Sequence, residues 1–293
     1  MDNNALHLCY FQAIFSIRRL TCERRSRTIS EELLPIDEFL DELKSIRSQA
    51  AKAILAGKFG LPPLGQSDQS EASKRPEIIF LMQLGVYPEW RESHLLGRQL
   101  KHIDDPGLLR RVGQQIADET KHAAVLCAQL EAWGADPKRL YHEPIYEWSA
   151  SFDYMDKLLT PVEYFAVSNF IGEGLFLPTL LAPMAKFDPE TFAVYVEHIL
   201  PDEPHHVRLG QDFIFRYCRD LDTQSRVRRH AKIVARQYCL GFEAAVRYAK
   251  IAASGADPLD VRDEAVLDVL DPPAVTWAGV DKVYDELVAQ FEM

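Results

Sequence analysis

The sequence has little of what defines several large classes of protein. Its five cysteines are widely spaced and include no Cys-x-x-Cys pair, which argues against a disulfide framework or a zinc ribbon and for a reducing compartment. No apolar run is long enough to span a membrane. The first residues carry an acid where a secretory signal needs bases. We therefore expect a cytoplasmic protein that has no membrane partner.

Basic charge is also scarce. The formal net charge is -11, whereas a general nucleic-acid binder needs a basic surface to meet phosphates. Residues 226–236 are locally basic, but such a run is more often the solvated face of a helix. We expect no nucleic-acid partner.

Period-two alternation, which indicates strands, is hardly visible, and apolar residues recur instead at helical spacing through most of the chain. The pattern predicts an all-α fold. Two connections are expected to be loops, residues 61–76 and 135–158, because they are polar or rich in helix breakers. The predicted helices span residues 30–58, 77–103, 106–133, 160–186, 188–220, 223–254 and 279–291.

Three of these helices have clear start signals. Asp105 precedes a proline at the first helical position, and Asp188 repeats this arrangement. Thr160 opens a capping box with Glu163. The signals define two helical hairpins, residues 77–133 and 160–220.

Each hairpin carries one copy of the motif Asp-Glu-x-x-His in its second helix. The first copy contains Glu119 and His122, and the second contains Glu203 and His206. A Glu and a His three residues apart project from one helix face, so both can bind one metal ion. A single copy is weak evidence. Two copies at similar distances from their helix starts indicate a metal site.

Each motif needs a partner carboxylate from the preceding helix of its hairpin. In the second hairpin this is Glu173, which lies on an apolar stripe where a carboxylate is costly unless it is paired or binds metal. In the first hairpin, the spacing falls between Glu89 and Glu92. Glu92 is preferred, because Pro88 is expected to kink the helix beside Glu89.

Four glutamates and two histidines form the ligand set of di-iron and di-manganese carboxylate bundles. Carboxylates with two imidazoles suit iron or manganese better than zinc, which usually closes with four ligands. Asp118 and Asp202 are placed to accept hydrogen bonds from the histidine of the opposite motif. His205 is either a solvent-facing neighbour of His206 or an extra ligand. The predicted ligands are Glu92, Glu119, His122, Glu173, Glu203 and His206, with Glu89 and His205 as alternatives.

On these residues, the sequence resembles the ferritin-like di-iron superfamily, which includes ribonucleotide reductase small subunits, acyl-carrier-protein desaturases and N-oxygenases. The resemblance implies a ferritin-like four-helix bundle at residues 77–220. Residues 1–76 would be an N-terminal extension, and residues 221–293 would be helices packed on the core of one domain. It also implies that Glu119 and Glu203 bridge two metals. Pro204 departs from the family pattern, because a proline inside a helix removes a hydrogen bond.

The resemblance implies a di-iron oxygenase or oxidase that uses dioxygen to hydroxylate, desaturate or N-oxygenate a small organic substrate. The cofactor would be two iron ions, with manganese or a mixed centre as alternatives. The expected partners are dioxygen, the substrate and an electron-donor protein or reductant, with a homodimer as an option. Phe165, Phe170, Phe176 and Leu177 are expected to wall the substrate pocket. The alternative functions are a heme-oxygenase-like di-metal oxidase, iron storage, peroxide scavenging and a metal-free interaction protein.

Overall fold

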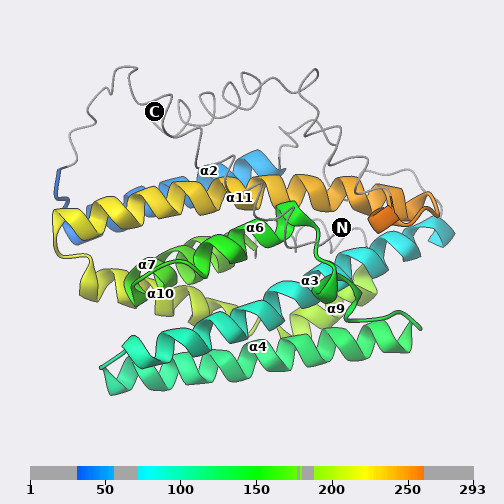
Figure 1. The fold of residues 1–293 in the computed structure, drawn as a ribbon, viewed down its shortest axis with the longest axis horizontal. Coiled ribbons are helices and arrows are strands. Elements are labelled where there is room, and N and C mark those ends of the chain that lie inside the picture. Colours follow the sequence, from blue (N-terminus) through cyan, green and yellow to red (C-terminus); the bar gives the residue numbers. More distant parts are fainter. Residues whose placement is uncertain (1–31, 56–70, 177–178, 180–187, 261–293) are drawn as a thin grey trace, which may run out of the picture. The chain divides into compact units, whose positions relative to one another are not determined.

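The computed structural model describes residues 32–55, 71–176, 179 and 188–260. These residues form helices joined by turns and contain no strand, which confirms the predicted all-α class (Figure 1). In this part of the chain, no helix has the length and the apolar character needed to cross a membrane. The short helix predicted at residues 279–291 lies outside the described residues.

The first hairpin pairs α3 (Glu71–Gln99) with α4 (Pro106–Ala132), and a single 3-10 turn, η1 (Leu100–His102), follows α3. The two helices lie side by side along the lower edge of Figure 1. The start of α4 is as predicted, because the Asp105 carboxylate accepts a hydrogen bond of 2.8 Å from the backbone N–H of Leu108. This cap satisfies one of the free donors of the first turn.

The second hairpin is less regular. Its first helix begins as predicted, with the Thr160 hydroxyl accepting a hydrogen bond of 3.4 Å from the backbone N–H of Glu163. After little more than one turn this helix widens into a π-helix. The second helix of the hairpin is divided in two. The elements are α7 (Pro161–Phe165), the π-helix η2 (Ala166–Glu173), α9 (Pro189–His198) and α10 (Glu203–Tyr217).

The division between α9 and α10 corrects the single helix expected at residues 188–220. Residues 199–202 form a turn, and α10 begins at Glu203. Pro204 therefore lies in the first turn of α10, where its missing N–H would have no partner in any case. The second Glu-x-x-His motif thus occupies the start of a helix, and Pro204 fits there without kinking a helix interior.

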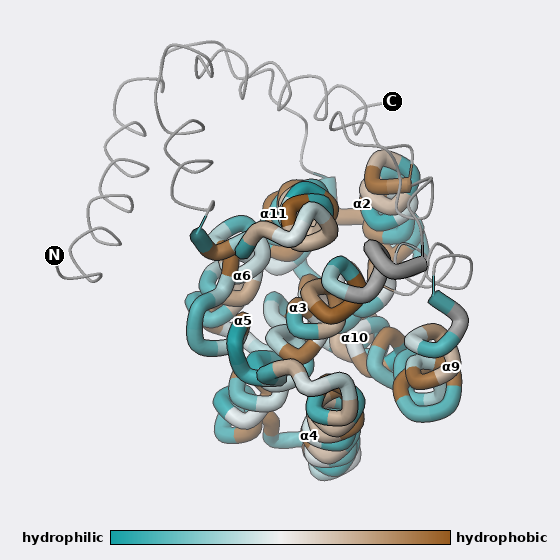
Figure 2. Tube along the Cα trace, turned by 90° about the vertical axis from the view of Figure 1, so that its right-hand side faces the viewer, coloured by the Kyte–Doolittle hydropathy of each residue, from teal (hydrophilic) through white to brown (hydrophobic). Residues whose placement is uncertain are grey.

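Further helices cover one side of the hairpins. The longest, α11 (Leu221–Ala253), packs against α2 (Ile36–Leu55), α3, η2 and α6 (Tyr146–Met155). In Figure 2, α3 lies between α4 and α11. The short α5 (Arg139–His142) also contacts α3. The fold therefore buries α3 on several sides.

Three predicted boundaries differ from the structure. The first helix begins at Ile36 and not at residue 30, and α3 begins six residues before residue 77, inside the expected loop. The connection at residues 135–158 contains α5 and α6 where a loop was expected. Helix α6 packs against α11 and α3, and α5 packs against α3. Such tertiary contacts stabilise helices that the local sequence pattern does not predict.

The π-helix and α10 approach each other so closely that the contact requires a glycine. A Cβ atom on Gly210 would lie 2.6 Å from the carbonyl oxygen of Phe165 and 2.7 Å from the backbone nitrogen of Phe170. Both neighbours are backbone atoms, which cannot turn aside as a side chain can. Gly210 therefore sets the distance between the second Glu-x-x-His motif and η2.

We expect Gly210→Ala to lower the free energy of unfolding by about 1–3 kcal/mol, because it overpacks a backbone contact. Gly113→Ala is the matched control, since Gly113 is an exposed position of α4 with no atom within 4 Å of the added Cβ. It should raise the free energy of unfolding by about 0.5–1 kcal/mol, the helix preference of alanine over glycine. Urea denaturation of the metal-free proteins measures both, and equal stabilisation by the two substitutions would contradict the close approach.

Candidate metal centre

The two Glu-x-x-His motifs face each other across the interior. The rings of His122 on α4 and His206 on α10 have centroids 6.0 Å apart. The Nδ1 atom of His122 lies 3.6 Å from a Glu119 oxygen and 3.7 Å from a Glu203 oxygen. For His206 the same two distances are 3.2 Å and 3.5 Å. Glu119 and Glu203 thus each lie beside both imidazoles, which is the position a bridging carboxylate needs.

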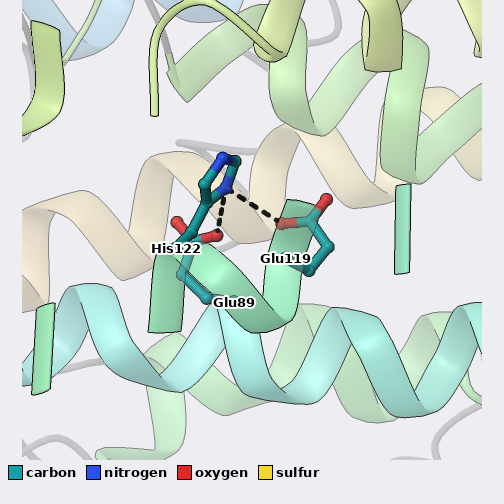
Figure 3. A group of neighbouring side chains, drawn as sticks. All are labelled: Glu89, Glu119 and His122. Carbon is teal, nitrogen blue, oxygen red and sulfur yellow. Dashed lines mark hydrogen bonds and ion pairs between the residues drawn. The ribbon is translucent and has the colours of Figure 1, made fainter. Parts of the chain in front are cut away.

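Glu89 completes a group of three candidate ligands on the α3 and α4 side. Its Oε2 atom lies 3.1 Å from His122 Nδ1, and Figure 3 shows the polar ends of Glu89, Glu119 and His122 directed toward one another. One ligand atom from each lies within 4.8 Å of the other two, so the three can hold one metal ion. All three side chains are buried.

Glu92, the preferred candidate from the sequence, occupies a different place. Its Oε1 atom accepts a hydrogen bond of 2.6 Å from the Tyr164 hydroxyl and another from the Ser168 hydroxyl. Helix α3 remains helical through Pro88, and both glutamates follow this proline on the same helix. The proline is therefore no reason to prefer Glu92 over Glu89. The geometry therefore favours Glu89 over Glu92 as the candidate ligand beside His122. Glu92 remains a neighbour of the cluster.

A second group of three ligands lies on the other side of the cluster. Glu119, Glu173 and His206 each offer one ligand atom within 4.8 Å of the others. Glu173 is the last residue of η2. Burial and the nearby carboxylates of Glu203 and Glu119 raise its pKa well above the ordinary value. Glu119 belongs to both groups, so two ions held here would share it.

The outer nitrogen of each histidine meets an aspartate from the opposite motif. His122 Nε2 lies 3.1 Å from Asp202 Oδ2, and His206 Nε2 lies 3.4 Å from Asp118 Oδ2. An Nε2–H that donates to these carboxylates leaves Nδ1 as a lone pair directed at the cluster. These are the positions expected for Asp118 and Asp202. His205 is exposed to solvent, away from this arrangement.

The buried charge of the cluster fits metal ions. His206 Nδ1 and Glu203 Oε2 are buried but form no hydrogen bond, and a buried polar atom without a partner is costly. When ionised, the four carboxylates nearest the imidazoles would carry four negative charges, which two divalent cations would balance. The residues present therefore fit two ions. The four carboxylates are those of Glu89, Glu119, Glu173 and Glu203.

A chain of amides connects the two motifs to the π-helix. Gln115 donates a hydrogen bond of 3.0 Å to Glu119 Oε1. Asn169 in turn donates to the Gln115 oxygen at 2.6 Å and to the backbone carbonyl of His206 at 3.0 Å. Gln115 was not among the predicted site residues. Its position one helical turn before Glu119, on the same helix face, could have indicated it.

Arg47 supports the π-helix from α2. It donates a hydrogen bond of 3.0 Å to the carbonyl oxygen of Phe170, and its guanidinium carbon lies 4.8 Å from the centre of the Phe170 ring. Burial lowers the pKa of Arg47 below its ordinary value. No local pattern could have identified this residue, because its partner lies 123 positions away in the sequence.

A pocket reaches the cluster from the side of α6 and α11. It encloses a space of about 420 Å³, part of which is open to solvent. Of the expected wall residues, Phe176 lines it, Phe165 and Phe170 do not, and Leu177 lies outside the described residues. The lining consists of Pro88, Glu89, Glu92, Glu119, Trp148, Phe152, Ser168, Gly172, Glu173, Phe176 and Tyr238.

Tyr238 stands at the junction of the pocket and the cluster. Its hydroxyl oxygen lies 2.7 Å from the place that a Cβ atom of Gly172 would occupy. Burial, together with the carboxylates of Glu92, Glu173 and Glu119, raises the pKa of Tyr238 well above the ordinary value. The hydroxyl therefore keeps its proton and can donate a hydrogen bond inside the pocket.

We expect Glu89→Gln to weaken metal binding more than Glu92→Gln, because Glu89 lies beside His122 whereas Glu92 accepts hydrogen bonds from Tyr164 and Ser168. Protein reconstituted with ferrous iron without oxygen should contain about two ions per chain. Elemental analysis should show that Glu89→Gln loses at least one of them at limiting iron. A greater loss in Glu92→Gln would restore the assignment made from the sequence.

The metal-free protein should lose stability as pH rises from about 5 to 8. Burial raises the pKa of Glu89 and of Glu92 to about 7, and hydrogen bonds to Glu119 and Glu89 outweigh burial and raise that of His122 to about 11. Over this pH range the folded state thus holds protons that the unfolded state releases. Each such proton lowers the free energy of unfolding by about 1.4 kcal/mol per pH unit. The pKa of Glu119 is lowered. Its effect on stability therefore has the opposite sign, and it occurs at a more acidic pH.

Thermal melts at several pH values test this dependence, and a divalent cation provides the control. Because the cation displaces the extra protons, metal-loaded protein should keep or gain stability over the same pH range. A metal-free protein whose melting temperature rises from pH 5 to 8 would show that the cluster is not protonated as described.

Comparison with protein-family models, with curated proteins and with solved structures gives no match. The interpretation of this centre therefore depends on the residues and contacts of the chain itself.

Proposed function

We propose that this chain is a ferritin-like di-iron protein that activates dioxygen to oxidise a small organic substrate. One observation carries the proposal. The Nδ1 atoms of His122 and His206 point into one set of buried glutamates, two of which lie beside both rings. A solvated helix face would not bury this much unpaired charge.

The distribution of the ligands over the helices supports the ferritin-like assignment. One glutamate comes from α3 and one from η2, and a Glu-x-x-His motif comes from each of α4 and α10. This is the arrangement of di-iron and di-manganese carboxylate bundles. Iron is proposed because oxygen-rich sites with two imidazoles suit it, and manganese or a mixed centre would use the same ligands.

Two ferrous ions, when bound here, would together supply the two electrons needed to activate dioxygen. The chain supplies the geometry. Asp118 and Asp202 hold the histidine rings, and Lys121 pairs with Asp202. Gln115 and Asn169 fix Glu119 relative to α10. The aromatic pocket walls would limit the contact of a bound substrate with water.

The electron balance defines a further partner. Insertion of one oxygen atom of dioxygen into a C–H bond, with the other leaving as water, consumes two electrons and two protons besides those of the substrate. The described residues contain three free cysteines, of which two are buried, and no pair that could supply these electrons repeatedly. An electron-donor protein or small reductant is therefore part of the proposal.

The pocket favours an oxygenase over the alternatives. Iron storage and peroxide scavenging need access for ions or for peroxide, but not a cavity lined by Trp148, Phe152 and Phe176 at the ligands. A heme-oxygenase-like di-metal oxidase uses one Glu-x-x-His motif. Here both motifs direct their histidines into the same cluster, which favours the ferritin-like interpretation.

Excess ferrous iron in air separates an oxygenase from a store. We expect the reconstituted protein to consume dioxygen and to retain about two irons per chain, since six ligands serve two ions. Glu119→Ala should abolish most of this oxygen consumption, because Glu119 lies in both ligand groups. An oxygen electrode and elemental analysis after gel filtration provide the measurements.

The matched control is Glu190→Ala, which removes an exposed glutamate from α9 and should leave iron content unchanged. If each chain took up tens of irons into a soluble mineral, iron storage would replace the oxygenase as the proposed function. If neither Glu119→Ala nor Glu203→Ala reduced the iron content, the site would lie elsewhere.

A further inference from the structure

We propose that the pocket beside the carboxylate cluster selects an uncharged molecule with a single aromatic ring and one polar substituent. The inference rests on the proposed function only for the oxidation of this molecule, because binding itself depends on the pocket. Three independent properties of the lining lead to it: the shape of its walls, the sign of its charge and its hydrogen-bond donors.

The walls of the pocket suit a flat ring. Phe152 meets the edge of Tyr238 at a centroid distance of 6.4 Å, and Trp148 meets Phe242 edge-on at 5.4 Å. Such pairs hold the rings at defined angles, and an inserted aromatic ring can meet them by stacking or by edge contact. Part of the space of about 420 Å³ is open to solvent, so the enclosed part beside these rings is smaller and suits a single ring better than a larger molecule.

The charge of the lining excludes anions. The described lining residues include four glutamates and no lysine, arginine or histidine. The arginines that contact α6 are already paired, Arg91 with Asp153 at 3.2 Å and Arg247 with Glu147 at 2.8 Å. A carboxylate substrate would enter without a cationic partner from the protein, which is costly in a buried site. Two divalent ions would balance the four carboxylates nearest the imidazoles, and Glu92 would add either a further negative charge or a proton, so the ions would leave no net positive charge to attract an anion.

The indole of Trp148 supplies an unused donor. Its Nε1 atom is buried and has no hydrogen-bond partner, and 6% of the residue is exposed. The Cε3 edge of the ring faces α11, where it would lie 3.1 Å from a Cβ atom on Gly241. Nε1 is on the opposite edge of the indole. A buried N–H without an acceptor is rare in proteins, so an acceptor on a bound molecule would complete this site.

The Tyr238 hydroxyl is a second donor, and it lies beside the residue that precedes Glu173. It contacts the position of Gly172, the neighbour of Glu173. A ring between the two aromatic walls could therefore present a substituent to Trp148 or to Tyr238 while a carbon of the ring faces the cluster. Hydroxyl and amide oxygens are uncharged groups that can accept a hydrogen bond from such donors.

Equilibrium binding without oxygen tests the proposal. Protein loaded with two ferrous ions is titrated by calorimetry under nitrogen with phenol, benzoate and cyclohexanol. Phenol should bind at one site per chain. Benzoate should bind at least tenfold more weakly because its charge finds no partner, and cyclohexanol about fivefold more weakly because it lacks an aromatic face. Benzoate or cyclohexanol binding as tightly as phenol would overturn the proposal, as would the absence of saturable phenol binding.

Two conservative substitutions test the donors. Trp148→Phe and Tyr238→Phe remove a donor each but keep an aromatic ring, and at least one should weaken phenol binding about fivefold, the worth of one hydrogen bond. Tyr248→Phe is the matched control, because it removes a buried hydroxyl from the same helix at a residue that does not line the pocket. It should leave the affinity unchanged. Unchanged affinity in both pocket variants, or an equal loss in the control, would overturn the assignment of the donors.

The ranking of the three probes on the unsubstituted protein decides the matter even if a variant fails to fold. The test is also separate from the oxygen chemistry. Phenol binding as expected, in a protein that consumes no dioxygen, would support the pocket and refute the proposed function. Dioxygen consumption with tighter binding of benzoate would support the proposed function and refute the substrate class.

Discussion

The burial of several carboxylates at one place in a helical bundle is the constraint on which the rest of the structure depends. Glu89, Glu119 and Glu203 are each no more than 6% exposed, although water would stabilise their charges far better than an apolar core. Only cations, protons or hydrogen bonds can offset this cost. The raised pKa values of the metal-free cluster, its inward Nδ1 atoms and its unpartnered oxygen are different signs of the same unmet requirement.

Two irregular segments of backbone bring the ligands of the second hairpin into place. The π-helix η2 ends at Glu173, and the turn at residues 199–202 lets α10 start at Glu203. A π-helix inserts one residue into a helical turn and rotates the residues after it, and such segments are frequent at functional sites. The surrounding contacts hold this arrangement, through Gly210 in the packing and Arg47 at the Phe170 carbonyl. The distortion costs free energy, and under the proposed function metal binding would offset that cost.

Features that depend on residue spacing along one helix could be predicted from the sequence, whereas features that depend on packing between helices could not. The all-α class, the cap at Asp105 and the facing of His122 toward Asp202 agree with local periodicity and helix geometry. The choice between Glu89 and Glu92 depended on the rotation of α3 around its axis, which α4 and α11 fix jointly. Helix α6 and the contact of Arg47 with Phe170 arise from residues far apart in the chain, so no local signal could reveal them.

The cluster has two unlike sides, which under the proposed function would separate the tasks that an oxidation requires. The pocket touches Glu89, Glu92, Glu119 and Glu173, but neither histidine and not Glu203. The histidines lie toward Asp118 and Asp202, whose side chains are 13% and 23% exposed and thus connect the cluster to solvent. A substrate in the pocket would therefore meet the carboxylate side. A partner on α4 and α10 would meet the imidazole side, so an electron donor and a substrate would not compete for one surface.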